Sequence, residues 1–472
     1  MYRVTANGKE LEVHGMRVSA CPLNRLFEGE QRDLRYTERA YWLTLDTDRP
    51  LELTIEADKD FSSYELRPQK MNFREKREGR KIVLTVCAPM QFILGLDGVR
   101  EALHIFVNRP SRPPCGGNVL YFAKGEHHAG LIWLESGQTL YLEEGARVYG
   151  AVYAKDAENI QICGRGVIDS SPYRRYNDLL PDGHELQKQL AEHGLCEADT
   201  HYLGNLTLYH CRDVSIEGVA FEDAPLWSVT VRNGCENVVI DNVKIIGQWR
   251  YNADGIDICT SENVTVRNCF VRSFDDCIVA RAAYLPGENA PVRNLLVQNC
   301  VLWCDWGKCL EVWGGNIPAA IINVAFEDCC LVRLSWIAMS ITTMYGSEDM
   351  RIENISYKNI FIDEDKYFLP PVFVGAGCPD PEYSASAARG FSPFLVCIRA
   401  EKLGRRLELG SQLYEEADDL SGFSIRYRNI AFENIAGGCG SMPVSVMENT
   451  DYLKVENLLF VQEGNGRGAS RF

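Results

Sequence analysis

A short pattern recurs along most of the chain: a polar residue, an aliphatic residue, any residue, an aliphatic residue, any residue, a polar residue and an apolar residue. Its best-spaced copies begin at Asp213, Asn237, Asn263, Asn294, Asn323 and Asp349, in steps of 24, 26, 31, 29 and 26 residues. Periods of this size indicate stacked supersecondary units. The apolar runs have strand length, Asn and Gly mark the corners, and no helix-period stretch suits a leucine-rich horseshoe. We therefore expect an all-β fold, a parallel β-helix with coils about 4.8 Å apart.

The first part of the chain has a different pattern. Residues 1–109 contain short alternating runs such as "YWLTLDT" and "LELTIEA", which are typical of an antiparallel β-sandwich. The stretch "RPSRPPCGG" that follows is a natural linker. We expect a small N-terminal β-sandwich over 1–109 and the β-helix over 116–472, with insertions near 172–205 and 361–423 that interrupt the repeat and could wall a cleft.

The charge of the chain excludes several partners. It has 49 Lys and Arg against 65 Asp and Glu, a formal net charge of -16. No Lys- or Arg-rich run alternates with aromatic residues, so nucleic acid and anionic membranes are not expected partners. The N-terminus lacks the pattern of a secretory signal and no apolar segment is long enough to span a membrane, so we expect a cytoplasmic protein. Whether it forms a homo-oligomer stays open.

Eighteen cysteines are spread along the chain rather than grouped in a short secreted scaffold. Those beside strand-like runs are expected to be reduced and buried as small hydrophobic residues: Cys211, Cys235, Cys259, Cys269, Cys277 and Cys300. Cys300, Cys304 and Cys309 do not have the spacing of a zinc site, and no His is near. No metal site is expected.

Three acids stand out in "NADGIDICTSENVTVRNCFVRSFDDCIVAR", which runs from Asn252 to Arg281. Asp254 precedes the Asp275 and Asp276 pair by about one coil, so the three carboxyl groups should meet on one outer face of the β-helix. The backbone must bend at "SFDDC" for both members of the pair to reach that face. Like charges in proximity raise the proton affinity of at least one group. One carboxyl can then serve as a general acid and another as a base, the division of roles that glycoside hydrolysis requires.

These segments resemble a known family. "NADGIDI" followed by "DDCIVAR" is similar to the "NTDGID" and "DDC" segments of glycoside hydrolase family 28, the polygalacturonase family of right-handed parallel β-helices, and the likeness in organisation extends from about residue 116 onward. The resemblance implies that Asp275 is the general acid, that Asp254 and Asp276 activate water, and that Asn252 orients them. It also implies inversion at the anomeric carbon, with neither a metal nor an organic cofactor. Asp257, in "GID", is expected to serve in turn chemistry.

Two departures from the family concern the substrate. Where polygalacturonases carry Gly-His-Gly, this chain has "CDWGKC", with Trp306 in the place of the histidine, and where they carry Arg-Ile-Lys to bind the galacturonate carboxylate, it has Ser340, Ile341 and Thr342. An Arg and Lys pair supplies charge-assisted contacts that Ser and Thr cannot replace. Together with the N-terminal sandwich, this makes the chain similar also to glycoside hydrolase family 49, the dextranases and isopullulanases, and indicates a neutral sugar.

Other residues are candidates for substrate contact. Trp306 is expected to stack on a sugar ring, whereas at least one of Trp303 and Trp313 should be core. Lys308 and Arg281 could partly replace the missing carboxylate reader. For Glu311 two roles stay open, a contact to a sugar hydroxyl or a pair with Lys308.

We therefore expect an inverting glycoside hydrolase of neutral oligosaccharides or glycan fragments. Three alternatives remain: a galacturonide-cleaving hydrolase, a β-helical uronate lyase or epimerase, and a non-catalytic carbohydrate-binding β-helix. The missing basic pair disfavours the lyase, and the full set of Asn252 and three acids disfavours the non-catalytic protein.

Overall fold

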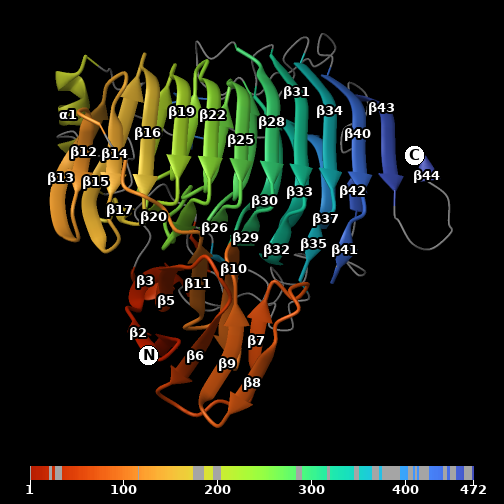
Figure 1. The fold of residues 1–472 in the computed structure, drawn as a ribbon. Coiled ribbons are helices and arrows are strands. Elements are labelled where there is room, and N and C mark those ends of the chain that lie inside the picture. Colours follow the sequence, from red (N-terminus) through yellow and green to blue (C-terminus); the bar gives the residue numbers. More distant parts are fainter. Residues whose placement is uncertain are drawn as a thin grey trace.

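The computed structural model describes residues 2–20, 24–26, 34–114, 116–173, 185–194, 204–282, 290–315, 319–344, 350–363, 372–374, 394–401, 408–409, 412–413, 425–438, 444–446, 453–461 and 470–471. Strands dominate it (Figure 1), and they stack into a long solenoid with a smaller β-domain attached to one side. The predicted all-β fold, a right-handed parallel β-helix preceded by a small sandwich, is confirmed. Most of both insertions, 172–205 and 361–423, lies outside the described residues. Within the described ranges, no helix is long and apolar enough to cross a membrane.

The N-terminal region forms two five-stranded sheets. The first contains, in spatial order, β2 (Lys9–Leu11), β1 (Tyr2–Ala6), β6 (Leu51–Ala57), β9 (Lys81–Val86) and β8 (Glu75–Glu78). The second contains β3 (His14–Ser19), β5 (Thr37–Asp46), β11 (Leu103–Asn108), β10 (Met90–Leu96) and β7 (Tyr64–Arg67), with the 3-10 turn η1 (Leu34–Tyr36) before β5. One expectation was wrong: the sheets are not wholly antiparallel, because β5 and β11 pair in parallel. Five strands separate β5 from β11 in the sequence, so no tight hairpin forces the two to run in opposite directions.

The β-helix has three rows of strands. Eleven parallel strands and a final antiparallel one form a 12-stranded sheet: β12 (Val119–Phe122), β14 (Thr139–Leu142), β16 (Glu158–Gly164), β19 (Arg212–Glu217), β22 (Glu236–Asp241), β25 (Glu262–Arg267), β28 (Val292–Gln298), β31 (Ala320–Glu327), β34 (Met350–Lys358), β40 (Ile425–Glu433), β43 (Leu453–Val461) and β44 (Ser470–Arg471).

The other two rows share β15. The first, which we call the acid row, contains β13 (Gly125–Leu134), β15 (Ala146–Lys155), β18 (Leu206–Tyr209), β21 (Val229–Arg232), β24 (Ile256–Cys259), β27 (Ile278–Ala282), β30 (Lys308–Gly314), β33 (Ile337–Met344), β37 (Phe394–Glu401) and β42 (Val444–Val446). The second, the docking row, contains β17 (Val167–Asp169), β20 (Ala220–Glu222), β23 (Lys244–Ile246), β26 (Phe270–Ser273), β29 (Val301–Cys304), β32 (Cys330–Arg333), β35 (Phe361–Ile362) and β41 (Ala436–Gly437).

Few described elements lie outside these sheets. A short helix, α1 (Glu185–Glu192), contacts β13 at the N-terminal end of the acid row. Two small pairs complete the set, β4 (Asn24–Leu26) with β36 (Val372–Val374), and β38 (Glu408–Leu409) with β39 (Gln412–Leu413).

The N-terminal sheets cover the docking row. Trp42 and Phe106 of the second sheet pack in one apolar cluster with Phe270 and Trp303 of the β-helix. Polar contacts at the same junction include Lys244 Nζ to Asn108 Oδ1, at 2.6 Å. The acid row is therefore left to face another direction. The domain boundary itself, between residues 109 and 116, stays a prediction.

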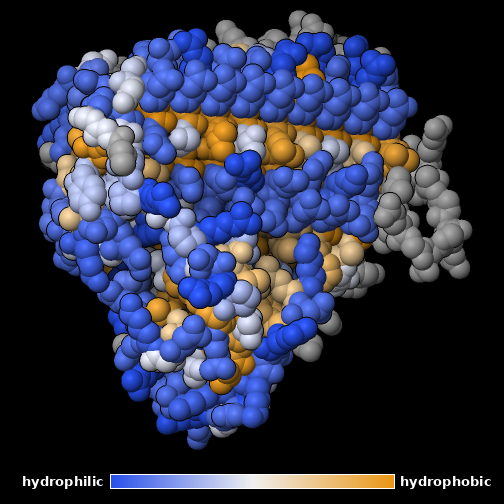
Figure 2. All heavy atoms as spheres, in the orientation of Figure 1, coloured by the Kyte–Doolittle hydropathy of each residue, from blue (hydrophilic) through white to orange (hydrophobic). Residues whose placement is uncertain are grey.

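Asn residues at the corners stack on one another beside the 12-stranded sheet. The amide Nδ2 of each Asn donates to the side-chain Oδ1 of the Asn before it, at 2.8–3.0 Å. The resulting Asn ladder contains Asn263, Asn294, Asn323, Asn354, Asn429 and Asn457. All six have positive φ, between 55° and 59°, a conformation that Asn tolerates better than most residues. Figure 2 shows hydrophilic rows along this face on both sides of a narrower apolar strip.

The cysteines follow the expectation from the sequence. Cys211, Cys235, Cys259, Cys269, Cys277 and Cys300 are all buried and unbridged. Most of them pack with Val, Ile and Leu in the interior of the β-helix.

We predict that Asn323→Ala destabilises the protein by about 2 kcal/mol, because it removes two ladder hydrogen bonds and places a Cβ without a stabilising amide at φ 58°. Asn323→Gly loses the same hydrogen bonds without the backbone strain, and should cost about half as much. Urea unfolding of the two variants measures the difference. Equal losses would contradict the role of the left-handed corner.

Candidate active site

The register of the acid row fixes which side chains lie on its outer face. Ile256, Ile278 and Leu310 pair in sequence and point into the core. The intervening residues therefore form an outer column by alternation. From β15 to β33 this column contains Tyr153, Thr207, Thr230, Asp257, Val279, Glu311 and Ser340. A second outer column contains Lys155, Tyr209, Arg232, Cys259, Arg281, Trp313 and Thr342.

Asp254, Asp275 and Asp276 lie in the turns that lead into this row. Asp254 precedes β24, and the Asp275 and Asp276 pair precedes β27. The Gly255 N–H donates to the backbone carbonyl of Asp276 at 2.8 Å, which joins the two turns directly. The backbone leaves strand geometry between Ser273, where β26 ends, and Ile278, where β27 begins. The three acids therefore lie on neighbouring coils at a bend.

The site is more enclosed than expected. We expected the acids to reach solvent, but Asp254 is 2% exposed, Asp275 9% and Asp276 4%. Beside them, Trp306 packs with Tyr251 and Phe274 in an apolar cluster. This packing of aromatic side chains on the turns, which spacing along the sequence does not reveal, accounts for part of the burial.

Gly307 brings two of the carboxyl groups together. A Cβ at this position would lie 2.4 Å from Asp275 Oδ1 and 2.4 Å from Asp276 Oδ1. Both carboxyl groups therefore approach the same point of the backbone on the next coil, and only a residue without a side chain fits there. Glycine is required here because of this close approach rather than because of a turn.

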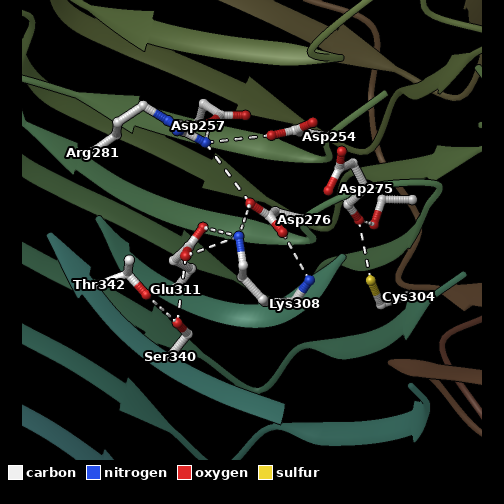
Figure 3. Close-up of polar contacts among 11 residues, drawn as sticks. Asp254, Asp257, Asp275, Asp276, Arg281, Cys304, Lys308, Glu311, Ser340 and Thr342 are labelled. Atoms are coloured by element: carbon white, nitrogen blue, oxygen red, sulfur yellow. Dashed lines mark hydrogen bonds and ion pairs between the residues drawn. The ribbon is translucent and has the colours of Figure 1, made fainter. Parts of the chain in front are cut away.

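Arg281 is surrounded by acids (Figure 3). Its guanidinium lies 3.1 Å from Asp257 Oδ1, 3.5 Å from Asp254 Oδ2 and 3.9 Å from Asp276 Oδ2. The rings of Trp227 and Trp313 lie 4.6 and 4.8 Å from its Cζ atom. Arg281 is thus fixed between two aromatic rings and paired with carboxyl groups of this chain.

Lys308 is also paired within the site. Its Nζ atom lies 3.4 Å from Asp276 Oδ2 and 3.1 Å from Glu311 Oε1, and its backbone N–H donates to Asp276 Oδ1 at 2.8 Å. Of the two roles left open for Glu311, the structure shows the pair with Lys308 (Figure 3). Glu311 is fully buried, and Ser340 Oγ donates to it at 3.4 Å.

The environment separates the proton affinities of the acids. Burial, and then the charges of Asp257, Asp275 and Asp276, raise the pKa of Asp254 well above its usual value. Burial also acts to raise the pKa of Asp276, but Lys308, a hydrogen bond from Glu311 and Arg281 together hold it below the usual value. The same environment therefore shifts the two pKa values in opposite directions, that of Asp276 down and that of Asp254 up.

Asp257 was wrongly assigned to turn chemistry. It lies on β24, is fully buried and accepts a hydrogen bond from Arg281 Nε at 3.1 Å. Burial raises its pKa to about 7, against the opposing charge of Arg281. The alternation Ile256, Asp257, Ile258 was the available signal, because it places the acid on the outer face of β24. Arg281 lies on the next strand, β27, two positions after Val279, which is the register partner of Asp257.

The remaining candidates, Asn252 and Trp306, lie in a turn and in an apolar cluster respectively. Asn252 has a φ of 52° and lies in the turn before Asp254. Just ahead of this turn, Trp249 Nε1 donates a hydrogen bond to Asp223 Oδ1 at 2.8 Å. Trp306 is only 7% exposed and packs against Phe274, with ring centroids 5.4 Å apart, so its expected stacking on a sugar stays a prediction.

The residues in place of the carboxylate reader are buried and face the site. Ser340 and Thr342 lie on β33, paired in register with Glu311 and Trp313, and their hydroxyl groups are 2.9 Å apart. In the described part of the chain, no group of three or more His, Cys, Asp or Glu residues could hold a metal ion.

The close approach of the two carboxyl groups to Gly307 leads to a prediction about stability. Gly307→Ala should destabilise the protein by about 1–3 kcal/mol, since the added methyl group must displace Asp275, Asp276 or the backbone. Gly117→Ala, where a Cβ meets nothing within 4 Å, is the matched control and should be near neutral. Urea unfolding measures both, and equal stability of the two variants would contradict the described packing.

The chain is similar to known carbohydrate-active proteins. Residues 143–375 match the family described as Glycosyl hydrolases family 28. An exopolygalacturonase of Cochliobolus carbonum is 24% identical over 198 residues, 33% of this chain and 44% of that protein. A probable exopolygalacturonase B of Emericella nidulans is 27% identical over 223 residues, 44% of this chain and 46% of that protein. This chain thus spans less than half the length of these relatives.

Among solved structures, Dex49A from Penicillium minioluteum aligns with 97% of this chain and 87% of its own, with a TM-score of 0.58 and 14% identity, a similarity of fold alone. Its alignment covers the N-terminal sheets as well as the β-helix. The family match, by contrast, lies wholly within the β-helix and includes the three acids. The chain is thus a parallel β-helix protein that, over residues 143–375, is similar to glycoside hydrolase family 28.

Proposed function

We propose that the protein is a glycoside hydrolase that cleaves its substrate by direct attack of water. The observation that carries this proposal is the convergence of Asp275 and Asp276 on Gly307 beside the turn of Asp254, with the pKa of Asp276 lowered and that of Asp254 raised. A base and an acid side by side at neutral pH are what glycosidic hydrolysis requires. The match to family 28 supports the same reaction class.

The environments suggest a role for each group. Asp276, ionised beside Lys308, is the base that takes a proton from the attacking water. Asp254, whose pKa is raised, is suited to hold that water by a hydrogen bond. Asp275 shares the Gly307 contact with Asp276 and is the most exposed of the three, which suits a general acid that must reach the leaving oxygen. Asn252, in the turn before Asp254, orients this set.

We further propose a neutral sugar at the point of cleavage. The two basic candidates for a carboxylate reader already have acidic partners, Arg281 in Asp257 and Asp254, and Lys308 in Asp276 and Glu311. A sugar carboxylate would have to compete with these contacts. The hydroxyl groups of Ser340 and Thr342 suit sugar hydroxyls instead.

A galacturonide remains the second candidate, because the curated relatives carry the name exopolygalacturonase. In that case Lys308, which is 14% exposed at its side chain, would turn from Glu311 to the substrate carboxylate. Whether the sugar is neutral or a galacturonide, the proposed partner is an oligosaccharide or a polysaccharide.

The first prediction concerns the substrate. Neutral α- and β-linked oligosaccharides should be hydrolysed and oligogalacturonides should not, and Asp275→Asn should lower kcat by at least a hundredfold, because it removes the proton donor. Reducing-end assays on the paired panel measure both. Cleavage of galacturonides that is lost selectively in Lys308→Met would establish the second candidate. An ultraviolet-absorbing product would indicate a lyase, and binding of panel sugars without turnover would indicate a non-catalytic protein.

The second prediction concerns pH. Lys308→Met should move the acid limb of the kcat/KM profile upward by about one pH unit, because the base Asp276 loses the cation that lowers its pKa and protonates earlier on acidification. Lys308→Arg keeps the charge and should leave the limb near its original position. An acid limb that does not move in Lys308→Met would show that Asp276 is not the base.

A further inference from the structure

Two buried hydroxyl groups on the acid row have no role in the chemistry above. Thr207 of β18 and Thr230 of β21 are 2% and 0% exposed. Their neighbours Leu206, Leu208 and Val229 point into the core, so both threonine side chains lie on the outer face. Neither Oγ1 atom has a hydrogen-bond partner among the described residues.

A buried hydroxyl without a partner is costly. Its desolvation reduces stability unless a hydrogen bond compensates. Valine has the same shape and the same preference for strands, and Val279 on β27 occupies the same outer column. Two adjacent threonines whose hydroxyl groups are unpartnered therefore indicate a ligand that supplies the missing hydrogen bonds.

The two hydroxyl groups continue the polar surface of the acid site. The register joins Thr207 to Thr230 and Thr230 to Asp257. Asp257 Oδ2 and Asp254 Oδ1 are likewise buried atoms without a hydrogen-bond partner among the described residues. Because coils stack about 4.8 Å apart, the strip from Asp257 to Thr207 is about 10 Å long.

The neighbouring outer column places aromatic rings beside the two threonines. Tyr209 lies beside Thr207 and its ring is contacted by two cations, Lys155 Nζ at 5.0 Å and Arg232 Cζ at 6.0 Å. Beyond Thr207 the strip ends at Tyr153, which stacks on Trp133 with ring centroids 5.3 Å apart. Hydroxyl groups bordered by aromatic rings match a pyranose, which has polar edges and apolar faces.

We propose that Thr207 and Thr230 form a sugar-binding subsite next to the cleavage site, on the side of the N-terminal coils. Each threonine hydroxyl both donates to and accepts from a hydroxyl of a neutral pyranose unit that is not itself cleaved. This inference rests on the proposed function and extends it, because it requires a substrate with at least one further sugar unit in that direction. The same subsite accounts for the two uncompensated hydroxyl groups.

Thr207→Val and Thr230→Val test the subsite without changing side-chain shape. The probes are neutral gluco-oligosaccharides and oligogalacturonides of two to four units, titrated calorimetrically into Asp275→Asn protein so that no turnover occurs. Each valine variant should weaken binding of the longer neutral probes by about threefold to tenfold and leave the two-unit probes less affected. Thr265→Val, on β25 of the 12-stranded sheet, is the matched control and should bind as the parent does.

Thermal unfolding separates binding from structure. Both valine variants should unfold at the same temperature as the parent or higher, because an unpartnered buried hydroxyl is removed. A lower unfolding temperature with unchanged affinity would show that the threonines serve the fold, and would overturn the subsite. So would the absence of binding for every probe.

The outcomes for subsite and reaction are distinct. Hydrolysis of the panel by the unmodified chain, with equal affinity in the valine variants, would support the proposed function and overturn the subsite. Weakened binding in the valine variants, with no hydrolysis by the unmodified chain, would support the subsite and contradict the proposed function. An effect confined to oligogalacturonides would overturn the assignment of a neutral sugar.

Discussion

Two cations buried among acids determine how this site is built. Arg281 contacts Asp257 and Asp254, while Lys308 contacts Asp276 and Glu311. Without these cations, so many carboxyl groups in a buried region would all tend to be protonated, because burial disfavours the charged form. With Lys308 as the largest lowering influence, the pKa of Asp276 falls below its usual value, whereas the pKa of Asp254 and of Glu311 is raised. The same contacts occupy both cations, so the proposed selectivity and the proposed acid–base chemistry rest on one network.

The fold was predictable because its signals are local and repeated. The spacing of the Asn corners gave the coil length, and the ladder from Asn263 to Asn457 forms through contacts between successive coils. The positions of Asp254, Asp275 and Asp276 on neighbouring coils followed from the same period. Their burial did not follow, because it depends on how Trp306, Tyr251 and Phe274 pack across turns of variable length.

Other features of the structure depend on which residues pair across neighbouring strands, and the sequence alone does not define that register. Asp257 was misassigned because its partner Arg281 lies on the next strand, and pairing across strands requires the alignment of β24 with β27. The role of Glu311 could not be chosen for a similar reason, since only the geometry of β30 brings its carboxyl group to Lys308. The parallel pairing of β5 and β11 was missed because alternation reveals a strand but not its direction. In each case the missing information was a contact between distant residues.

The central claim is that Asp276 acts as a base on water rather than as a nucleophile on the sugar. A base gives inversion at the anomeric carbon, whereas a nucleophile would form a covalent intermediate and give retention. Proton NMR of the first product formed from whichever panel sugar is hydrolysed, recorded before mutarotation, measures this directly. The account predicts that the product has the opposite anomeric configuration to the bond cleaved. A product that keeps the configuration of the substrate would contradict it.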